Sequence, residues 1–116
     1  MKYSDAQRVQ KIYDNAVSLN KYLMENDIDK EMLLSSQPLQ WLVTTPLYNI
    51  GEHVYNLSDE YKNKHANIQW KMIAGLRHRL VHDYDGINWN VIVDIVYEEI
   101  PELIKQLENI KEDIVE

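Results

Sequence analysis

Apolar residues recur along most of the chain at the three- and four-residue spacing of an α-helix, and no useful length alternates as a β-strand does. Glycine and proline are scarce, with three residues each, so few positions favour turns or interrupt helices. The pattern therefore predicts an all-helical protein, an antiparallel bundle of four or five helices with short links. At 116 residues the chain has the length of one domain, which we expect to span residues 1–116.

Start and stop signals divide this pattern into helices. Ser4 and Gln7 have the spacing of a capping box and begin a helix that we expect to reach Glu25. A short helical turn is predicted at residues 30–34. Ser36 is the predicted N-cap of the next helix, because a proline follows in its first turn.

This second long helix contains two residues that helices usually avoid. Pro46 lies inside its apolar stripe and predicts a kink or two abutting helices. Gly51 lowers helix propensity and is best explained by a close approach of another backbone. A third helix is predicted from near Asn67 to the turn "DYDG", and a last one from Asn88 to Ile114, interrupted at Pro101.

Composition removes several classes of protein. Cysteine is absent, which excludes disulfides, a thiol nucleophile and cysteine-ligated zinc. The N-terminal sequence "MKYSDAQRVQKIYD" lacks the apolar core of a signal peptide, and no apolar stretch approaches the roughly 20 residues of a membrane span. We therefore expect a soluble, cytoplasmic protein.

The charge of the chain is unevenly distributed. A formal net charge of −7 argues against a nucleic-acid partner, because phosphate binding relies on Lys and Arg. Residues 61–82, however, contain five cations and no Asp or Glu, so this window carries +5 and the remainder −12. The cations are Lys62, Lys64, Lys71, Arg77 and Arg79. Either they bind phosphate or they form a solvated helix face, and charge alone leaves both possibilities open.

The end of this window holds two histidines with two possible chemistries. His78 and His82 are four residues apart and share a helix face, as in a zinc half-site. The spacing of Glu52, His53 or Asp83 does not require any of them as a third ligand, and the neighbouring arginines disfavour a dication. We therefore expect no metal site.

Metal-free cleavage of RNA is the other interpretation. The 2′-hydroxyl attacks the adjacent phosphate, which needs a base, an acid and a cation near the developing charge. Histidine suits the proton transfers and arginine suits the phosphate. Arg77 and His82 lie about 140° apart on a regular helix, so one copy supplies only part of this set. A two-fold dimer would supply two copies of each residue, and we expect Arg77 and His82 to converge at the mouth of its cleft.

The segment "RHRLVHDY", residues 77–84, resembles the R-x4-H-x-Y motif of the HepT-like branch of the HEPN ribonuclease superfamily. Three further segments are similar to this family in register: "YNIGEHVYNLSDEY" to its I-G-E helix, "IQWKMIAGLRHRLVHDYDGIN" to its motif block, and "IVYEEIPELIKQL" to its closing helix. The resemblance extends from Leu39 to the C-terminus. An R-x4-H pattern alone is common by chance, but in register with these segments it is specific.

The resemblance implies a HEPN-like, dimeric endoribonuclease without a cofactor, typically the toxin of a toxin–antitoxin pair. The antitoxin in such pairs is a small nucleotidyltransferase that adenylylates the motif tyrosine. Carried over by position, Arg77 and His82 would be catalytic and Tyr84 would be the modified residue. His78, often Asn in the family, and Glu52, the acid of I-G-E, would be supporting residues.

Other interpretations of these residues stay open. Glu52 is either an orienting residue or an ordinary packing glutamate, and Tyr84 is also compatible with closing the third helix onto the bundle. The protein as a whole is alternatively a non-catalytic dimer that binds a nucleotide or the nucleotidyltransferase in the same groove. The RNA-binding candidates are Arg79, Lys71, Lys64 and Lys62, and the three tryptophans, Trp41, Trp70 and Trp89, are assigned to the core or the dimer interface.

Overall fold

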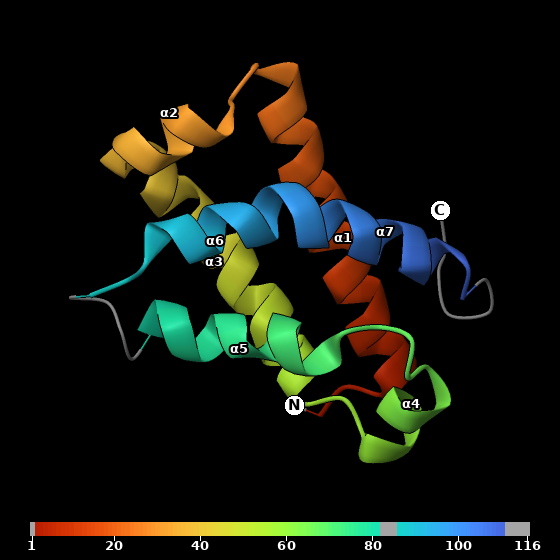
Figure 1. The fold of residues 1–116 in the computed structure, drawn as a ribbon. Helices are drawn as coiled ribbons and strands as arrows, with labels where there is room; N and C mark the ends of the chain where they lie inside the picture. The colour runs from red at the N-terminus through yellow and green to blue at the C-terminus, as the bar shows by residue number, and fades with distance from the viewer. Residues whose placement is uncertain (1, 82–85, 111–116) are drawn as a thin grey trace.

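A computed structural model describes residues 2–81 and 86–110, and all regular structure in these two ranges is helical. The helices are α1 (Asp5–Glu25), α2 (Lys30–Ser35), α3 (Gln37–Tyr55), α4 (Asp59–Lys64) and α5 (Trp70–Val81). A last continuous run consists of α6 (Trp89–Asp94), the π-helical turn η1 (Ile95–Glu99) and α7 (Ile100–Glu108) (Figure 1). The prediction of an all-helical protein is confirmed. None of these helices is both long and apolar enough to cross a bilayer.

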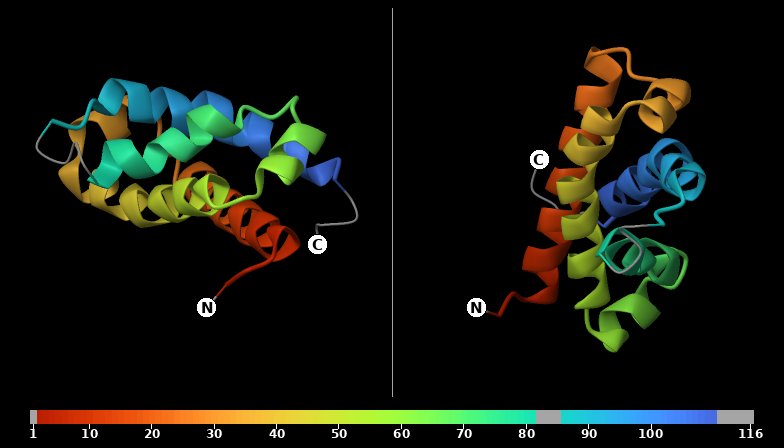
Figure 2. Two further views of the ribbon diagram at one scale, coloured as in Figure 1. Left: turned by 90° about the horizontal axis from the view of Figure 1, so that it is seen from below. Right: turned by 90° about the vertical axis from the view of Figure 1, so that its left-hand side faces the viewer.

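The helices form two layers that cross. α1 and α3 lie side by side and run in opposite directions, while α5 and the α6–α7 run lie across them (Figure 2). α3 is central, because it packs against α1, α2 and α5. The helix axes of the two layers are therefore not aligned with each other, in contrast to the simple antiparallel bundle that the sequence predicts. The crossing brings the C-terminal half of α3 against α5, which carries the arginine of the motif.

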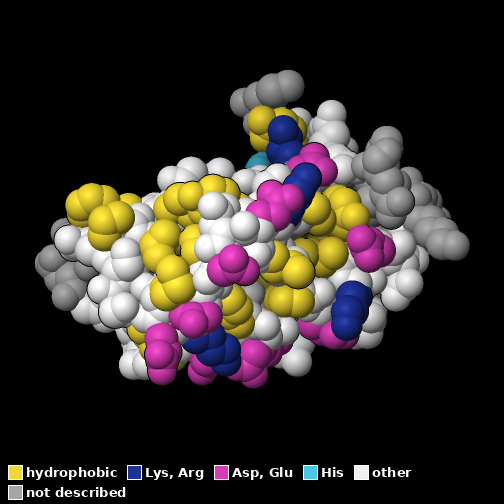
Figure 3. Space-filling view, turned by 90° about the horizontal axis from the view of Figure 1, so that it is seen from above, with side chains coloured by type: hydrophobic (Ala, Val, Ile, Leu, Met, Phe, Trp, Pro, Cys, Tyr) yellow, Lys and Arg dark blue, Asp and Glu magenta, His cyan; other side chains and the backbone are white. Residues whose placement is uncertain are grey.

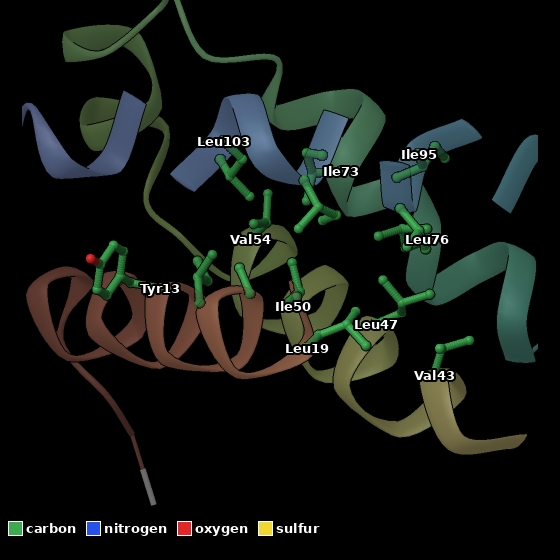
Figure 4. Packing of buried hydrophobic residues seen from close by; sticks show 14 of the residues in the cluster. Tyr13, Leu19, Val43, Leu47, Ile50, Val54, Ile73, Leu76, Ile95 and Leu103 are labelled. Atoms are coloured by element: carbon green, nitrogen blue, oxygen red, sulfur yellow. The ribbon is translucent and has the colours of Figure 1, made fainter. Parts of the chain in front are cut away.

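The core lies between the two layers. Each long helix contributes apolar side chains from the face that the sequence pattern marks, and burying them against one another removes their surface from water. Figure 4 shows part of this core. Its labelled members include Leu19 of α1, Val43, Leu47, Ile50 and Val54 of α3, Ile73 and Leu76 of α5, Ile95 of η1 and Leu103 of α7.

The two predicted capping residues, Ser4 and Ser36, are confirmed. The backbone N–H of Gln7 donates to Ser4 Oγ at 3.1 Å, and the backbone N–H of Ser4 donates to Gln7 Oε1 at 2.9 Å. This reciprocal pair is a capping box. At the start of α3, Ser36 Oγ accepts from the backbone N–H of Leu39 at 3.4 Å.

The two internal prolines have different outcomes. At Pro46 a single helix, α3, continues, and the two-helix alternative is wrong, because Val43 and Leu47 on either side are fully buried and hold both halves against the core. Before Pro101 the helix widens into η1, where the N–H of Ile100 donates to the carbonyl of Ile95 five residues back. The interruption predicted there is therefore a π-turn in a continuous run, since proline has no N–H to donate. Ile114 lies outside the described residues.

The segment between α3 and α5 differs from the prediction. Ser58 caps an additional short helix, α4, by accepting from the backbone N–H of Tyr61 at 3.1 Å. Its own hydroxyl donates to Asp5 Oδ2 at 2.6 Å, which ties α4 to the start of α1. α5 begins at Trp70 rather than near Asn67, because a turn precedes it. In this turn the indole N–H of Trp70 donates to the carbonyl of His65 at 3.0 Å.

The tryptophans do not share one environment. Trp70 is buried and Trp89 is half-buried, in agreement with a place in the core. Trp41 is 66% exposed, so of its two predicted places the core is wrong and the dimer interface stays a prediction. Its place on the outer side of α3, away from the buried Val43 and Leu47, explains the exposure.

Candidate active site between helices α3 and α5

The predicted site residues lie on three helices. Lys71, Arg77, His78 and Arg79 lie on α5, Glu52 lies on α3, and Lys62 and Lys64 lie on α4. His82 and Tyr84, together with Asp83, lie outside the described residues, so their placement stays a prediction. The described part of the site is therefore the half built around Arg77.

Arg77 is held by Glu52. Its Nε donates to Glu52 Oε1 at 2.5 Å, and the two side chains are 32% and 35% exposed. The hydrogen bond and charge of Glu52 raise the pKa of Arg77, an effect that burial partly opposes. This contact agrees with Glu52 as an orienting residue, and it leaves the guanidinium charged and fixed in direction.

A glycine allows this contact. An added Cβ on Gly51 would lie 2.7 Å from the backbone nitrogen of Arg77 and 3.2 Å from Leu76 Cβ. No side chain fits in that space, so the backbones of α3 and α5 meet there. The predicted close approach at Gly51 is confirmed, and the adjacent Glu52 is thereby brought within reach of Arg77.

Tyr55 completes the surroundings of Arg77, and the sequence reasoning missed it. The guanidinium carbon of Arg77 lies 4.4 Å from the centre of the Tyr55 ring, within cation–π distance. Tyr55 follows Glu52 by three residues and so shares its helix face. That spacing, next to the I-G-E sequence, was the signal that could have found it.

A pocket of about 570 Å³ opens beside Arg77. Four of the predicted residues and Tyr55 line it, together with Ala74 and Gly75. The predicted four are Lys71, Arg77, His78 and Arg79. Lys62 lies next to it, since its Nζ donates to the carbonyl of Tyr55 at 3.3 Å. Lys64 does not line the pocket. The cationic window is therefore concentrated around a hollow, in which phosphate oxygens would find several donors.

His53, next to Glu52, faces α1 instead. Its Nδ1 lies 3.2 Å from Arg8 Nη1, and Tyr3 contacts its ring edge-on. Burial, followed by the charges of Arg8 and Lys11, lowers the pKa of His53. Within residues 2–81 and 86–110, no three His, Cys, Asp or Glu side chains form a group that could hold a metal ion.

The face over α2 and α6 has the opposite character. Acidic and hydrophobic side chains are interspersed there, with few Lys or Arg (Figure 3). Lys30 of α2 is paired with Glu98 at 2.9 Å and with Asp94 at 3.5 Å. On this face acidic side chains therefore outnumber the cations, whereas the pocket beside Arg77 is lined by cations.

The fold and site define an all-helical protein in which a charged, oriented arginine lines a cationic pocket. A family model described as "Ribonuclease HepT-like" matches residues 6–110, and the chain belongs to this HepT-like family of the HEPN superfamily. The resemblance seen in the motif segments is confirmed.

Related proteins agree with this assignment. The chain is 40% identical to "Putative RNase MJ0127" of Methanocaldococcus jannaschii over 89 residues. This match covers 77% of the chain and 74% of the relative. It is 48% identical over 61 residues to "Putative RNase TTE0752" of Caldanaerobacter subterraneus, covering 53% of this chain and 54% of the relative. "Probable ribonuclease HepT" of Thermococcus cleftensis is 32% identical over 81 residues, 70% of this chain and 74% of the relative. No solved structure matches significantly.

Proposed function

We propose that this protein is a metal-independent endoribonuclease, with residues 1–116 forming one domain and the active site in the cleft of a symmetric homodimer. The observation that carries the proposal is the charged, oriented Arg77 in a cationic pocket, at the motif position of a family described as ribonuclease HepT-like. Three relatives whose names include RNase or ribonuclease support it.

The proposed reaction uses the substrate's own 2′-hydroxyl. His82 accepts the hydroxyl proton while the oxygen attacks the adjacent phosphorus, and the P–O5′ bond breaks. The partner subunit's His82 donates a proton to the leaving 5′-oxygen, so that a 2′,3′-cyclic phosphate and a free 5′-hydroxyl result. Arg77 stabilises the negative charge that builds on the phosphorane, and Glu52 keeps its guanidinium in place.

The remaining cations would hold the RNA strand. Lys71 and Arg79 line the pocket and Lys62 borders it, so phosphates on either side of the cleaved bond have partners. Lys64 extends the same positive surface along α4, and His78 lines the pocket as a supporting hydrogen-bonding residue. Binding through these charges weakens as the salt concentration rises, because the release of counterions from the RNA then contributes less free energy to binding.

We further propose that the protein is the cytoplasmic toxin of a toxin–antitoxin pair with a small nucleotidyltransferase. Adenylylation of Tyr84 would place a bulky, negatively charged group two residues from His82, where it would repel the RNA phosphate. Mass spectrometry of the protein after incubation with its proposed nucleotidyltransferase partner and ATP should show an added adenylyl group. The Tyr84→Phe variant should show none.

The direct test of the reaction is RNA cleavage in the presence of EDTA. The purified protein should cleave single-stranded RNA, and His82→Ala should not, although it should fold and associate as the unaltered protein does. Equal cleavage by both proteins would refute the proposal. Metal analysis of the purified protein checks the zinc alternative independently.

A binding protein without turnover is the second candidate. The pocket volume of about 570 Å³ is in the range of small-ligand sites, which fits a nucleotide as well as a segment of RNA. Nucleotide binding, or a stable complex with the nucleotidyltransferase, without any cleavage of RNA would favour this function.

A further inference from the structure

Tyr55 stands out among the aromatic residues of the site. It is 55% exposed, although a tyrosine ring gains free energy when it is buried. Its neighbour Val54 is fully buried and supplies the core contact at this end of α3. Packing of the core therefore does not account for an aromatic ring at residue 55.

The surroundings of Tyr55 are those of a polyanion site. The ring lines the pocket that Lys71, Arg77, His78 and Arg79 also line. The guanidinium of Arg77 lies over the ring at 4.4 Å, yet more than half of the residue remains open to solvent. An exposed ring surface and a fixed cation are thus side by side in one hollow.

This combination matches the chemistry of one nucleotide in a single strand. Unpaired bases stack on aromatic side chains, while Lys and Arg hold the backbone phosphates. A base in a duplex is already stacked on its neighbours and paired, so an aromatic side chain cannot stack on it unless the duplex opens. A tyrosine beside the phosphate-binding arginine would therefore select unpaired RNA.

We propose that Tyr55 binds a base of the RNA, stacking on the nucleotide next to the phosphate that Arg77 contacts. The inference rests on the proposed function for the identity of the polymer, and it adds a subsite and a preference for single-stranded segments. The pocket thereby recognises a base as well as a phosphate.

The test measures binding without cleavage. The probe is a fluorescent, single-stranded hexa-adenylate whose 2′-hydroxyls are methylated, which removes the attacking group. A second probe has the same backbone and abasic sugars. Affinities are measured by fluorescence anisotropy for the unaltered protein and for the Tyr55→Leu, Tyr55→Phe and Tyr55→Trp variants.

Stacking predicts that Tyr55→Leu binds the hexa-adenylate about 10-fold more weakly, whereas Tyr55→Phe, which keeps the ring, stays within about 2-fold. Tyr55→Trp should bind at least as tightly as the unaltered protein. The abasic probe should bind the unaltered protein more weakly, and Tyr55→Leu should not weaken it further.

Four results would overturn the inference. Equal weakening of both probes by Tyr55→Leu would assign Tyr55 to holding Arg77 in place. Unchanged binding of the hexa-adenylate, or no binding by the unaltered protein, would leave no base subsite. A changed mass of Tyr55→Leu in analytical ultracentrifugation would assign Tyr55 to an interface between copies. Base-dependent binding by a protein that does not cleave RNA would refute the ribonuclease proposal and leave the subsite standing.

Discussion

Among the residues that the structure describes, Arg77 and Lys30 each pair with an acid from a distant segment, and the two pairs differ in distance, exposure and the backbone beneath them. Arg77 and Glu52 connect α5 to α3 at 2.5 Å, with each side chain about a third exposed at 32% and 35%. Lys30 and Glu98 connect α2 to η1 at 2.9 Å, with the side chains 45% and 58% exposed. Glu98 shares Lys30 with a second acid, Asp94.

The difference lies in the backbone beneath each pair. Gly51 lets α3 and α5 meet, so Glu52 reaches Arg77 over a short distance and Tyr55 covers part of the guanidinium. Around Lys30 both acids stand on the surface, and water competes with them for the ammonium. The pair of Arg77 and Glu52 therefore fixes the orientation of a guanidinium, whereas the pair of Lys30 and Glu98 is a weak contact on the surface.

Replacing the two cations should separate these roles most clearly. Arg77→Ala should lower RNA cleavage by about 100- to 1000-fold, the usual effect of removing one transition-state donor. Lys30→Ala removes the cation of the other pair, far from the pocket, and should leave the cleavage rate unchanged. Initial rates on a single-stranded RNA in EDTA measure both. A comparable loss of cleavage in the two variants would remove the distinction between the pairs.

The close approach beneath the first pair can be broken directly. Gly51→Ala places a Cβ against the backbone of Arg77, so α3 and α5 must separate, at a cost of about 1–3 kcal/mol in the free energy of unfolding. Gly75→Ala is the matched control on α5, because nothing lies within 4 Å of its added Cβ. There the better helix propensity should stabilise the protein by about 0.5–1 kcal/mol.

Urea unfolding followed by circular dichroism gives both free energies. Opposite signs for the two glycine substitutions are expected. If Gly51→Ala were as stable as Gly75→Ala, the glycine would not be needed to bring the helices together.

The two acids offer a subtler comparison. Glu52→Gln keeps the shape and an acceptor oxygen but removes the charge that holds Arg77, so cleavage should fall by about 10-fold, less than for Arg77→Ala. Glu98→Gln makes the same chemical change in the exposed pair and should leave cleavage unaltered. Rates measured over a range of RNA concentrations distinguish poorer positioning, which lowers kcat, from poorer binding, which raises KM. A loss confined to KM would contradict an orienting role.

The smallest expected effect concerns the contact of α3 with α1. The pKa of His53 lies below the ordinary value of 6.5 in the folded chain, so the unfolded chain binds a proton first as the pH falls through 6.5. Stability should therefore decrease between about pH 6.5 and the lower folded pKa. Urea midpoints across this range should show the decrease, and His53→Gln should reduce it. An unchanged slope in His53→Gln would assign the decrease to other groups.

Two helix starts were predicted correctly from local signals, and one was missed. The capping box of Ser4 and Gln7 and the N-cap of Ser36 were predicted correctly, because donor and acceptor are three residues apart. Gly51 was also predicted correctly as a point of close approach, although the approaching backbone was not identified. α4 was missed, although Ser58 followed by two acidic residues is a helix start.

By itself the sequence determined the helical class, the buried faces, the main helix starts and the motif that places the chain in its family, since these depend on neighbours in the chain. Only the tertiary structure decided that Glu52 holds Arg77, 25 residues away, and that Tyr55 lies beneath the guanidinium in a shared pocket. The physical reason is that a helix pattern specifies which face is buried but not the helix it meets or the crossing. Both follow from packing the whole core at once, and the contact at Gly51 is where that packing fixes the site.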